Sequence, residues 1–513
     1  MNFKQVILLI LDGFGFRKID AYHPLSQAKT EFFSQIQKYG GFGLLQASGI
    51  FVGLDYDEVG GSDAGHISIG TGVIYYQNYT RINLAIKDGS FYQNEALNQA
   101  FLYAKRQKTR VHLIGLLTKK PVHAHISHLN ALINLAKNYP DVPVFLHIFA
   151  DGIDEIKGNF WNHLKEIKEL IKESNIKIGT ICGRFYAMDQ ENVWVLRTQR
   201  AFYLLVEGNG QKIENLDDFI EKNKSSLQDE TILEPFVVDE KSKVQNGDAL
   251  IFFNFRKDGI KQLFQAFFEK DFPHFPRPKR ENLLLVTFVP YLEEDKVLVA
   301  FPPKKIKTNL TKIISERGLA QIKITEQEKE KNLIYHFNGL YEAQHPKEIR
   351  KILPPSEKKL DQKPIQRGDE IIDHIVAAMT HKSEDLALIV ANIPCLDYVG
   401  HTGNFSLGVR AFSDLDPYIL KLIKNLPEDA LLIITSDHGN VEQLINPVTG
   451  EPDTTHNKNP VPFLMVSQKL KLKVKNEIIG SLIDIAPTIL EILGIEKPSE
   501  MEGESLIQIL GSD

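Results

Sequence analysis

Three short apolar runs stand out in the pattern of hydrophobic and polar positions: 6–11, 386–393 and 431–435. Each is rich in Ile, Leu and Val and shows no alternation between apolar and polar positions. A strand buried on both faces, as in the middle of a parallel sheet, has this pattern, although a buried helix segment can show it too. We expect these runs to be central strands of one parallel sheet.

Each of the three runs is followed by an acidic residue: Asp12 after the first, Asp397 after the second and Asp437 after the third. In open parallel sheets, ligands bind at the carboxyl ends of the strands. The runs come from both ends of the chain. We therefore expect one domain to be built from the two chain ends, with the middle of the chain inserted into it.

The middle of the chain carries patterns of its own. A Pro-rich, basic stretch at 301–310 is typical of a linker that returns to the first domain. The fold class that we predict is α/β: residues 1–78 and 308–513 form a domain with a largely parallel sheet flanked by helices, and residues 79–307 form an inserted α/β domain. Strands are predicted at 111–117, 144–149, 176–181 and 249–255, and helices at 127–138 and 160–174.

Composition and charge exclude several classes of protein. The chain has 513 residues, of which 43% are hydrophobic and 25% charged, as in ordinary globular proteins. Its net charge of −6 gives no electrostatic reason to expect nucleic acid or an anionic membrane as a partner. Two cysteines are too few for a disulfide framework, and the six-residue apolar run at the start is shorter than a secretory signal needs. We expect a cytoplasmic protein.

Six residues after strands or in loops have side chains that bind metals. Carboxylates combined with imidazoles suit Mn²⁺, Zn²⁺ or iron better than Ca²⁺. The alternative is a set of solvated turns with scattered histidines, but six such residues together favour a metal site. They are Asp12, Asp397, His401, Asp437, His438 and His456.

A glycine-rich segment at 60–66 surrounds one hydroxyl group, that of Ser62. Small residues let a phosphate approach the backbone, and a helix that starts here would offer free N–H groups to an anion. Two metals close together could activate the serine as a nucleophile. The alternative interpretation is that Ser62 is a helix N-cap.

These motifs resemble one family over essentially the whole chain. The sequences LLILDGFG, GSDAGH, HTGN, TSDHGN and THN, together with ASGIFVGL, YYQNYTRIN, GRFYAMD and FNFRKD, are similar to those of cofactor-independent (2,3-bisphosphoglycerate-independent) phosphoglycerate mutase, in the alkaline phosphatase superfamily. The resemblance implies an isomerase of glycolysis that interconverts 3-phosphoglycerate and 2-phosphoglycerate through a phosphoserine intermediate. It also implies a small phosphorylated substrate, a monomer, no 2,3-bisphosphoglycerate and two Mn²⁺ ions, although Zn²⁺ or Mg²⁺ would also fit.

The resemblance also assigns roles to individual residues. Ser62 would be the nucleophile, and His123 would move protons on and off the glycerate hydroxyls. Arg256 and Lys329 would hold the phosphate, and Asp154 and Arg184 would make further substrate contacts. The ligands of one metal would be Asp12, Ser62, Asp437 and His438, and those of the other Asp397, His401 and His456.

This chain departs from the family at three substrate-side arginines, which are replaced by Ile153, Gln190 and Gly259. An uncompensated loss of one such contact typically costs about 2–5 kcal/mol. The alternatives are therefore a metal-dependent phosphatase or phosphomutase for a different small phosphate ester, or a relative that binds without turnover. Lysines that could supply replacement charge are Lys119, Lys120, Lys257 and Lys261.

Overall fold

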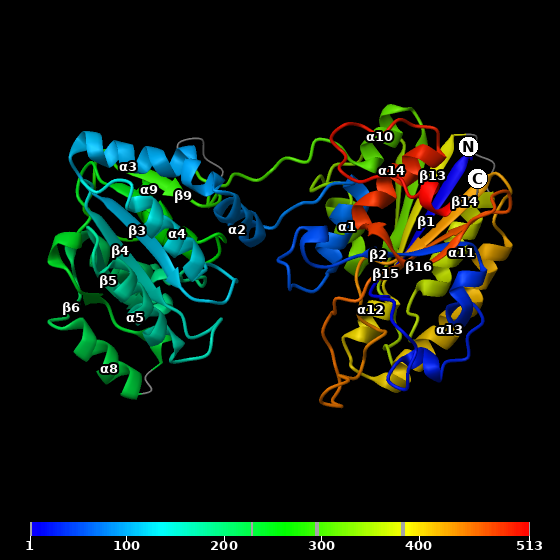
Figure 1. Cartoon of the computed structure of the whole chain (residues 1–513), viewed down its shortest axis with the longest axis horizontal. Coiled ribbons are helices and arrows are strands. Elements are labelled where there is room, and N and C mark those ends of the chain that lie inside the picture. Colours follow the sequence, from blue (N-terminus) through cyan, green and yellow to red (C-terminus); the bar gives the residue numbers. More distant parts are fainter. Residues whose placement is uncertain (1–2, 227–228, 293–296, 381–384, 512–513) are drawn as a thin grey trace. The chain divides into compact units, whose positions relative to one another are not determined.

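The computed structural model describes residues 3–226, 229–292, 297–380 and 385–511. The chain divides into two compact units: unit 1 comprises Met1–Gln77 and Lys305–Asp513, and unit 2 comprises Asn78–Lys304 (Figure 1). Among the described residues, each unit contains one eight-stranded sheet. The α/β class is confirmed, whereas the functional roles predicted for the two parts of the chain stay predictions.

The sheet of unit 1 is built around the three predicted strands. β1 (Gln5–Leu11) pairs in parallel with both β13 (Leu386–Ile393) and β14 (Ala430–Thr435). The strand order is β12-β11-β13-β1-β14-β15-β2-β16, and β15 runs antiparallel to both of its neighbours. The other strands are β2 (Gly41–Gln46), β11 (Ala320–Glu326), β12 (Glu348–Leu353), β15 (Val461–Val466) and β16 (Val474–Ser481).

Helices cover both faces of this sheet, and this explains the continuous apolar runs. Ile7 and Leu9 of β1 pack in one core with residues of α11 and α13, while Val6 and Leu8 pack in the other with residues of α1, α10 and α14. Alternate residues of the strand are therefore buried on opposite faces. The helices are α1 (Ser62–Thr71), α10 (Leu310–Glu316), α11 (Gly368–Thr380), α12 (Cys395–Gly400), α13 (Phe405–Lys424), α14 (Ile485–Ile492) and α15 (Ile507–Leu510).

Unit 2 has a sheet of the order β10-β9-β8-β3-β4-β5-β7-β6. β8, β3, β4 and β5 are neighbouring parallel strands, as expected for an inserted α/β fold. The strands are β3 (Val111–Leu117), β4 (Val144–Ala150), β5 (Ile176–Gly183), β6 (Gln211–Lys212), β7 (Phe236–Val237), β8 (Ala249–Phe252), β9 (Leu284–Thr287) and β10 (Leu298–Val299).

The predicted strand at 249–255 ends earlier than expected, at Phe252. After it the backbone N–H of Phe255 donates to the carbonyl of His123, and the side chain of Asn254 accepts from Leu116. The last apolar residues of the run thus join a loop. The helices of unit 2 are α2 (Asn78–Asp88), α3 (Glu95–Gln107), α4 (Ile126–Ala136), α5 (Asn159–Ile171), α6 (Arg184–Ala187), α7 (Gln199–Glu207), α8 (Leu216–Ser226) and α9 (Ile260–Phe268). Within the described part of the chain, no helix has the length and apolarity to cross a membrane.

Candidate active site

Four neighbouring parallel strands of unit 1 deliver charged side chains to one edge of the sheet. Asp12 follows β1 directly, Asp437 comes two residues after β14, and Asp397 lies in α12, which follows β13. Lys329 ends the short 3₁₀ turn that follows β11. The strand order β11-β13-β1-β14 makes these strand ends adjacent, so residues far apart in sequence come together as the sheet predicts.

The hydroxyl of Ser62 lies at the centre of this group. Its Oγ is 3.3 Å from Asp12 Oδ1 and 3.1 Å from His438 Nε2. The ammonium of Lys329 donates to the same Oγ over 2.8 Å. Ser62 is the first residue of α1, whose N-cap is Gly61, and its side chain makes no capping hydrogen bond. The N-cap interpretation of Ser62 is therefore wrong.

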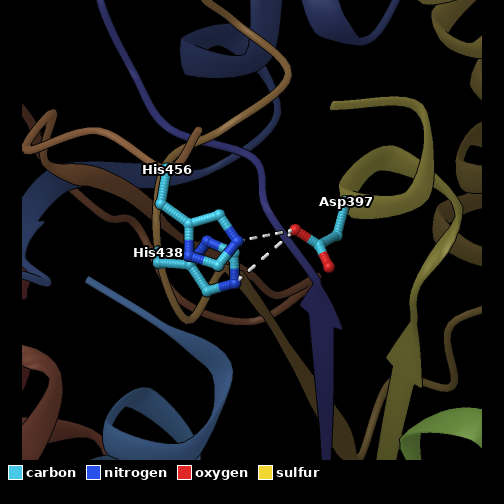
Figure 2. Close-up of side chains that lie close together, drawn as sticks. All are labelled: Asp397, His438 and His456. Atoms are coloured by element: carbon cyan, nitrogen blue, oxygen red, sulfur yellow. Dashed lines mark ion pairs between the residues drawn. The ribbon is translucent and has the colours of Figure 1, made fainter. Parts of the chain in front are cut away.

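A second group forms around Asp397 (Figure 2). Its Oδ1 is 3.2 Å from His456 Nε2 and 3.8 Å from His438 Nε2, and the two imidazole rings stack with centroids 3.8 Å apart. His401 joins them, with its Nε2 3.4 Å from Asp397 Oδ1 and 3.2 Å from His456 Nε2. The three side chains predicted to share one metal, Asp397, His401 and His456, therefore lie together, and His438 lies beside them.

Two sets of side chains have ligand atoms close enough to share a metal ion: Asp397 with His438 and His456, and Asp12 with His66 and Asp437. Anionic oxygens and imidazole nitrogens in this mixture fit a divalent transition metal. The sets differ from the predicted division, which placed His438 with Asp12, Ser62 and Asp437.

His438 faces both sets of ligands. Its Nε2 is 3.4 Å from Asp12 Oδ1, 3.7 Å from Asp437 Oδ2 and 3.8 Å from Asp397 Oδ1. The allocation of His438 to one ion stays a prediction. Burial disfavours its charged form, but Asp437 and Asp12 outweigh burial and raise the pKa of His438 to about 9.

Several positioning residues were not predicted. His66, four residues after Ser62 on α1, is fully buried and its Nδ1 is 3.2 Å from Asp437 Oδ2. Its place in the GSDAGH motif, one helical turn after the serine, was the available signal. Asn392 donates to Asp12 and Asn440 to Asp397, and each bond orients a carboxylate oxygen.

The ammonium of Lys329 lies among the carboxylates, 3.0 Å from Asp12 Oδ1 and 2.9 Å from Asp397 Oδ2. Burial lowers the pKa of Lys329, but Asp12, Asp397 and Asp437 outweigh it and hold the pKa above its ordinary value. Lys329 is therefore protonated and positively charged at neutral pH. It offsets part of the negative charge at the site.

The remaining predicted residues lie in unit 2, where loops after neighbouring strands also meet. Arg184, directly after β5, donates through Nη1 to Asp151 and Asp154, both over 2.7 Å. His123, after β3, has its Nε2 3.9 Å from Asp154 Oδ2. Burial and the charge of Arg184 lower the pKa of His123, which favours a neutral imidazole that can accept a proton. Arg256, after β8, pairs with Asp258.

Two of the three departures from the family are neighbours in space. A Cβ atom at Gly259 would lie 3.4 Å from Gln190 Nε2 and 2.9 Å from the carbonyl oxygen of Met188. Gly259 also has φ +77°, a conformation that side chains other than glycine disfavour. Ile153, the third departure, is 65% exposed. The backbone here suits glycine rather than arginine.

Comparisons with known proteins agree along the whole chain. The profile of the family described as BPG-independent PGAM N-terminus matches residues 82–293, and that of the sulfatase family matches residues 256–495. A 2,3-bisphosphoglycerate-independent phosphoglycerate mutase of Clostridium beijerinckii is 37% identical over 99% of both chains. A Methanosarcina barkeri protein named 2,3-bisphosphoglycerate-independent phosphoglycerate mutase 1 is 37% identical over 98% of both. The crystal structure of a Leishmania mexicana phosphoglycerate mutase shares the fold, with a TM-score of 0.59, 24% identity and 98% coverage of both chains.

Proposed function

The chain belongs to the 2,3-bisphosphoglycerate-independent phosphoglycerate mutase family, and on that premise we propose that Ser62 carries the phosphoryl group between the two positions of the substrate. The protein is an isomerase, an intramolecular phosphotransferase, that interconverts 3-phosphoglycerate and 2-phosphoglycerate. Full-length similarity at 37% identity does not favour the alternative of a phosphatase for another ester. The observation that carries the proposal is the position of the Ser62 hydroxyl among Asp12, His438 and Lys329.

The proposed reaction has two half-steps that mirror each other. Ser62 Oγ gives up its proton and attacks phosphorus, and the bond from phosphorus to the glycerate oxygen breaks; the proton given up by Ser62 balances the one that this oxygen takes up. That oxygen takes a proton, and the other hydroxyl of glycerate loses one before it attacks the phosphoserine. The backbone N–H groups at the start of α1 and the ammonium of Lys329 stabilise the negative charge on the phosphate oxygens.

We assign the proton transfers to His123, with Asp154 beside it. An imidazole with a lowered pKa can accept a proton from one hydroxyl and return it to the other. Arg184 holds Asp154 through its guanidinium and so fixes the carboxylate next to the imidazole. Arg256 is assigned to the phosphate, as the resemblance implies.

We propose Mn²⁺ as the metal, with Zn²⁺ and Mg²⁺ as the alternatives that the ligands also fit. The predicted ligands are Asp12, Ser62, Asp437 and His438 for one ion and Asp397, His401 and His456 for the other. Such a pair of cations would lower the pKa of the serine hydroxyl and neutralise the phosphate oxygens. Independence of 2,3-bisphosphoglycerate, a monomeric state and a cytoplasmic location stay predictions.

A matched pair of variants on one helix tests the role of Ser62. Ser62→Ala should lose the formation of 2-phosphoglycerate, measured by coupling to enolase, while free phosphate is measured in parallel. Ser68→Ala is the control because Ser68 is buried on the same helix and its hydroxyl has no partner among the described residues. Wild-type rates in Ser62→Ala would overturn the assignment, and stoichiometric phosphate release by the wild type would point to a phosphatase.

A further inference from the structure

A phosphoglycerate carries a carboxylate as well as a phosphate, and a carboxylate needs a cationic partner. At the strand ends of unit 2, several cations already have such a partner. Arg184 is bound by the carboxylates of Asp151 and Asp154, Lys119 lies 2.8 Å from Glu166, and Arg256 is paired with Asp258. The positions of Gln190 and Gly259 hold no charge.

Arg197 differs from these cations in how its partners are held. It lies in the π-helical turn η5 (Trp194–Thr198), and its Nη1 is 2.8 Å from Asp189 Oδ1 and 2.9 Å from Glu191 Oε2. The side chain of Asp189 is fully buried, whereas that of Glu191 is 70% exposed. One partner is thus a fixed anchor, and the other is a surface carboxylate.

The anchor itself is rigid. Asp189 accepts backbone hydrogen bonds from Glu191 and Val193, and its own carbonyl accepts from the buried side chain of Gln262. The guanidinium carbon of Arg197 lies 4.2 Å from the centre of the Phe185 ring. Its orientation is therefore set by one buried ion pair and one ring face.

The pair with Glu191 is the contact that a substrate can replace. Exposed ion pairs contribute little stability, so exchanging one carboxylate for another costs little. Both existing contacts use Nη1, and a guanidinium has five N–H donors in a planar fork that suits bidentate binding of a carboxylate. Asp189 would keep the guanidinium in place during the exchange.

Arg197 also lies where the charge is missing. Asp189 and Glu191 flank Gln190 in the sequence, and Gln190 adjoins Gly259 in space. Phe185, under the guanidinium, follows Arg184 directly. We propose that Arg197 binds the carboxylate of phosphoglycerate in this chain and that Glu191 is the counter-ion that the substrate displaces. The proposal rests on the proposed function.

Variants at Arg197 separate substrate binding from structural support. Arg197→Met should raise the KM for 3-phosphoglycerate by about tenfold or more, with a smaller change in kcat. Arg197→Lys, which keeps the charge but loses the fork, should give a smaller rise. Arg200→Met is the matched control. Arg200, in α7, pairs with Glu234, and its guanidinium carbon lies 4.5 Å from the centre of the Tyr186 ring. Its replacement should leave KM unchanged.

Two further measurements make the test specific. Glu191→Gln removes the competing carboxylate, so KM should fall severalfold. Glycerol 3-phosphate lacks the carboxylate, so its inhibition constant should be the same for wild type and Arg197→Met. An unchanged KM in Arg197→Met and Glu191→Gln would overturn the proposal. An equal loss of affinity for 3-phosphoglycerate and for glycerol 3-phosphate in Arg197→Met would overturn it as well. If the wild type itself formed no 2-phosphoglycerate, the proposed function would fail instead.

Discussion

Replacing Lys329 by methionine removes the positive charge from the centre of the site in unit 1. Its ammonium lies within 3.0 Å of both Asp12 Oδ1 and Asp397 Oδ2, and its side chain is largely buried. Breaking a buried pair by removing one partner typically costs about 3–5 kcal/mol. At about 2–3 °C per kcal/mol for a domain of this size, the melting transition of unit 1 should fall by roughly 6–15 °C in EDTA.

Divalent metal should reverse much of this loss, because bound cations also neutralise the same carboxylates. The kcat should nevertheless stay about 10²–10³-fold below that of the wild type, because Lys329 also contacts the Ser62 hydroxyl that receives the phosphoryl group. The measurements are calorimetry in EDTA and in Mn²⁺, and the enolase-coupled rate. Lys331→Met, two residues away on the surface, is the control for the loss of a lysine.

The pH dependence of the same variant has a definite sign. A lysine whose pKa is raised above its ordinary 10.5 contributes stability that is fully present below pH 10.5 and is lost as the pH rises beyond it. The destabilisation caused by Lys329→Met should therefore persist from about pH 7 to about pH 9 and be lost only above pH 10.5. An equal melting temperature for the two proteins in EDTA would refute the idea that Lys329 compensates the carboxylates.

Three further predictions concern other parts of the chain. EDTA should lower, and Mn²⁺ restore, the melting temperature of the wild type, and no change would argue against a metal site in unit 1. Burial lowers the pKa of His128 from 6.5 to about 3, so its contribution to stability is complete above pH 6.5 and is lost as the pH falls towards 3. His128→Gln should therefore make the melting temperature depend less on pH between these values. An unchanged dependence would contradict the role of buried His128. Gly259→Ala should lower the free energy of unfolding more than Gly158→Ala does. Both glycines have positive φ, but only at Gly259 would a Cβ meet other atoms within 4 Å. Equal unfolding free energies from denaturant titration would contradict this.

The sequence predicted the central strands of unit 1 well because they are buried on both faces, which leaves an uninterrupted apolar run. It also placed Asp12, Asp397 and Asp437 at one sheet edge, since the carboxyl ends of adjacent parallel strands meet there. The end of β8 was predicted too late because Phe253 and Phe255 are buried apolar residues that pack within a loop rather than within the sheet.

Other features of the site depend on geometry that one-dimensional patterns do not carry. Gln190 and Gly259 are far apart in sequence, so their proximity appears only in the fold. Arg197 was not predicted, because the feature that distinguishes it, one buried partner in Asp189 and one exposed partner in Glu191, appears only in the fold. His66 was missed although its spacing from Ser62 on a helix was visible.

The central claim is that Ser62 takes up the phosphoryl group, and acid quenching tests it most directly. Wild-type protein with Mn²⁺ is mixed with phosphoglycerate carrying a radioactive phosphate, quenched in acid within the first turnover and digested. We expect label on the peptide that contains Ser62, and none in Ser62→Ala. If the wild type converts 3-phosphoglycerate to 2-phosphoglycerate but carries no label, the role of Ser62 would be contradicted. Label on another residue would contradict it as well.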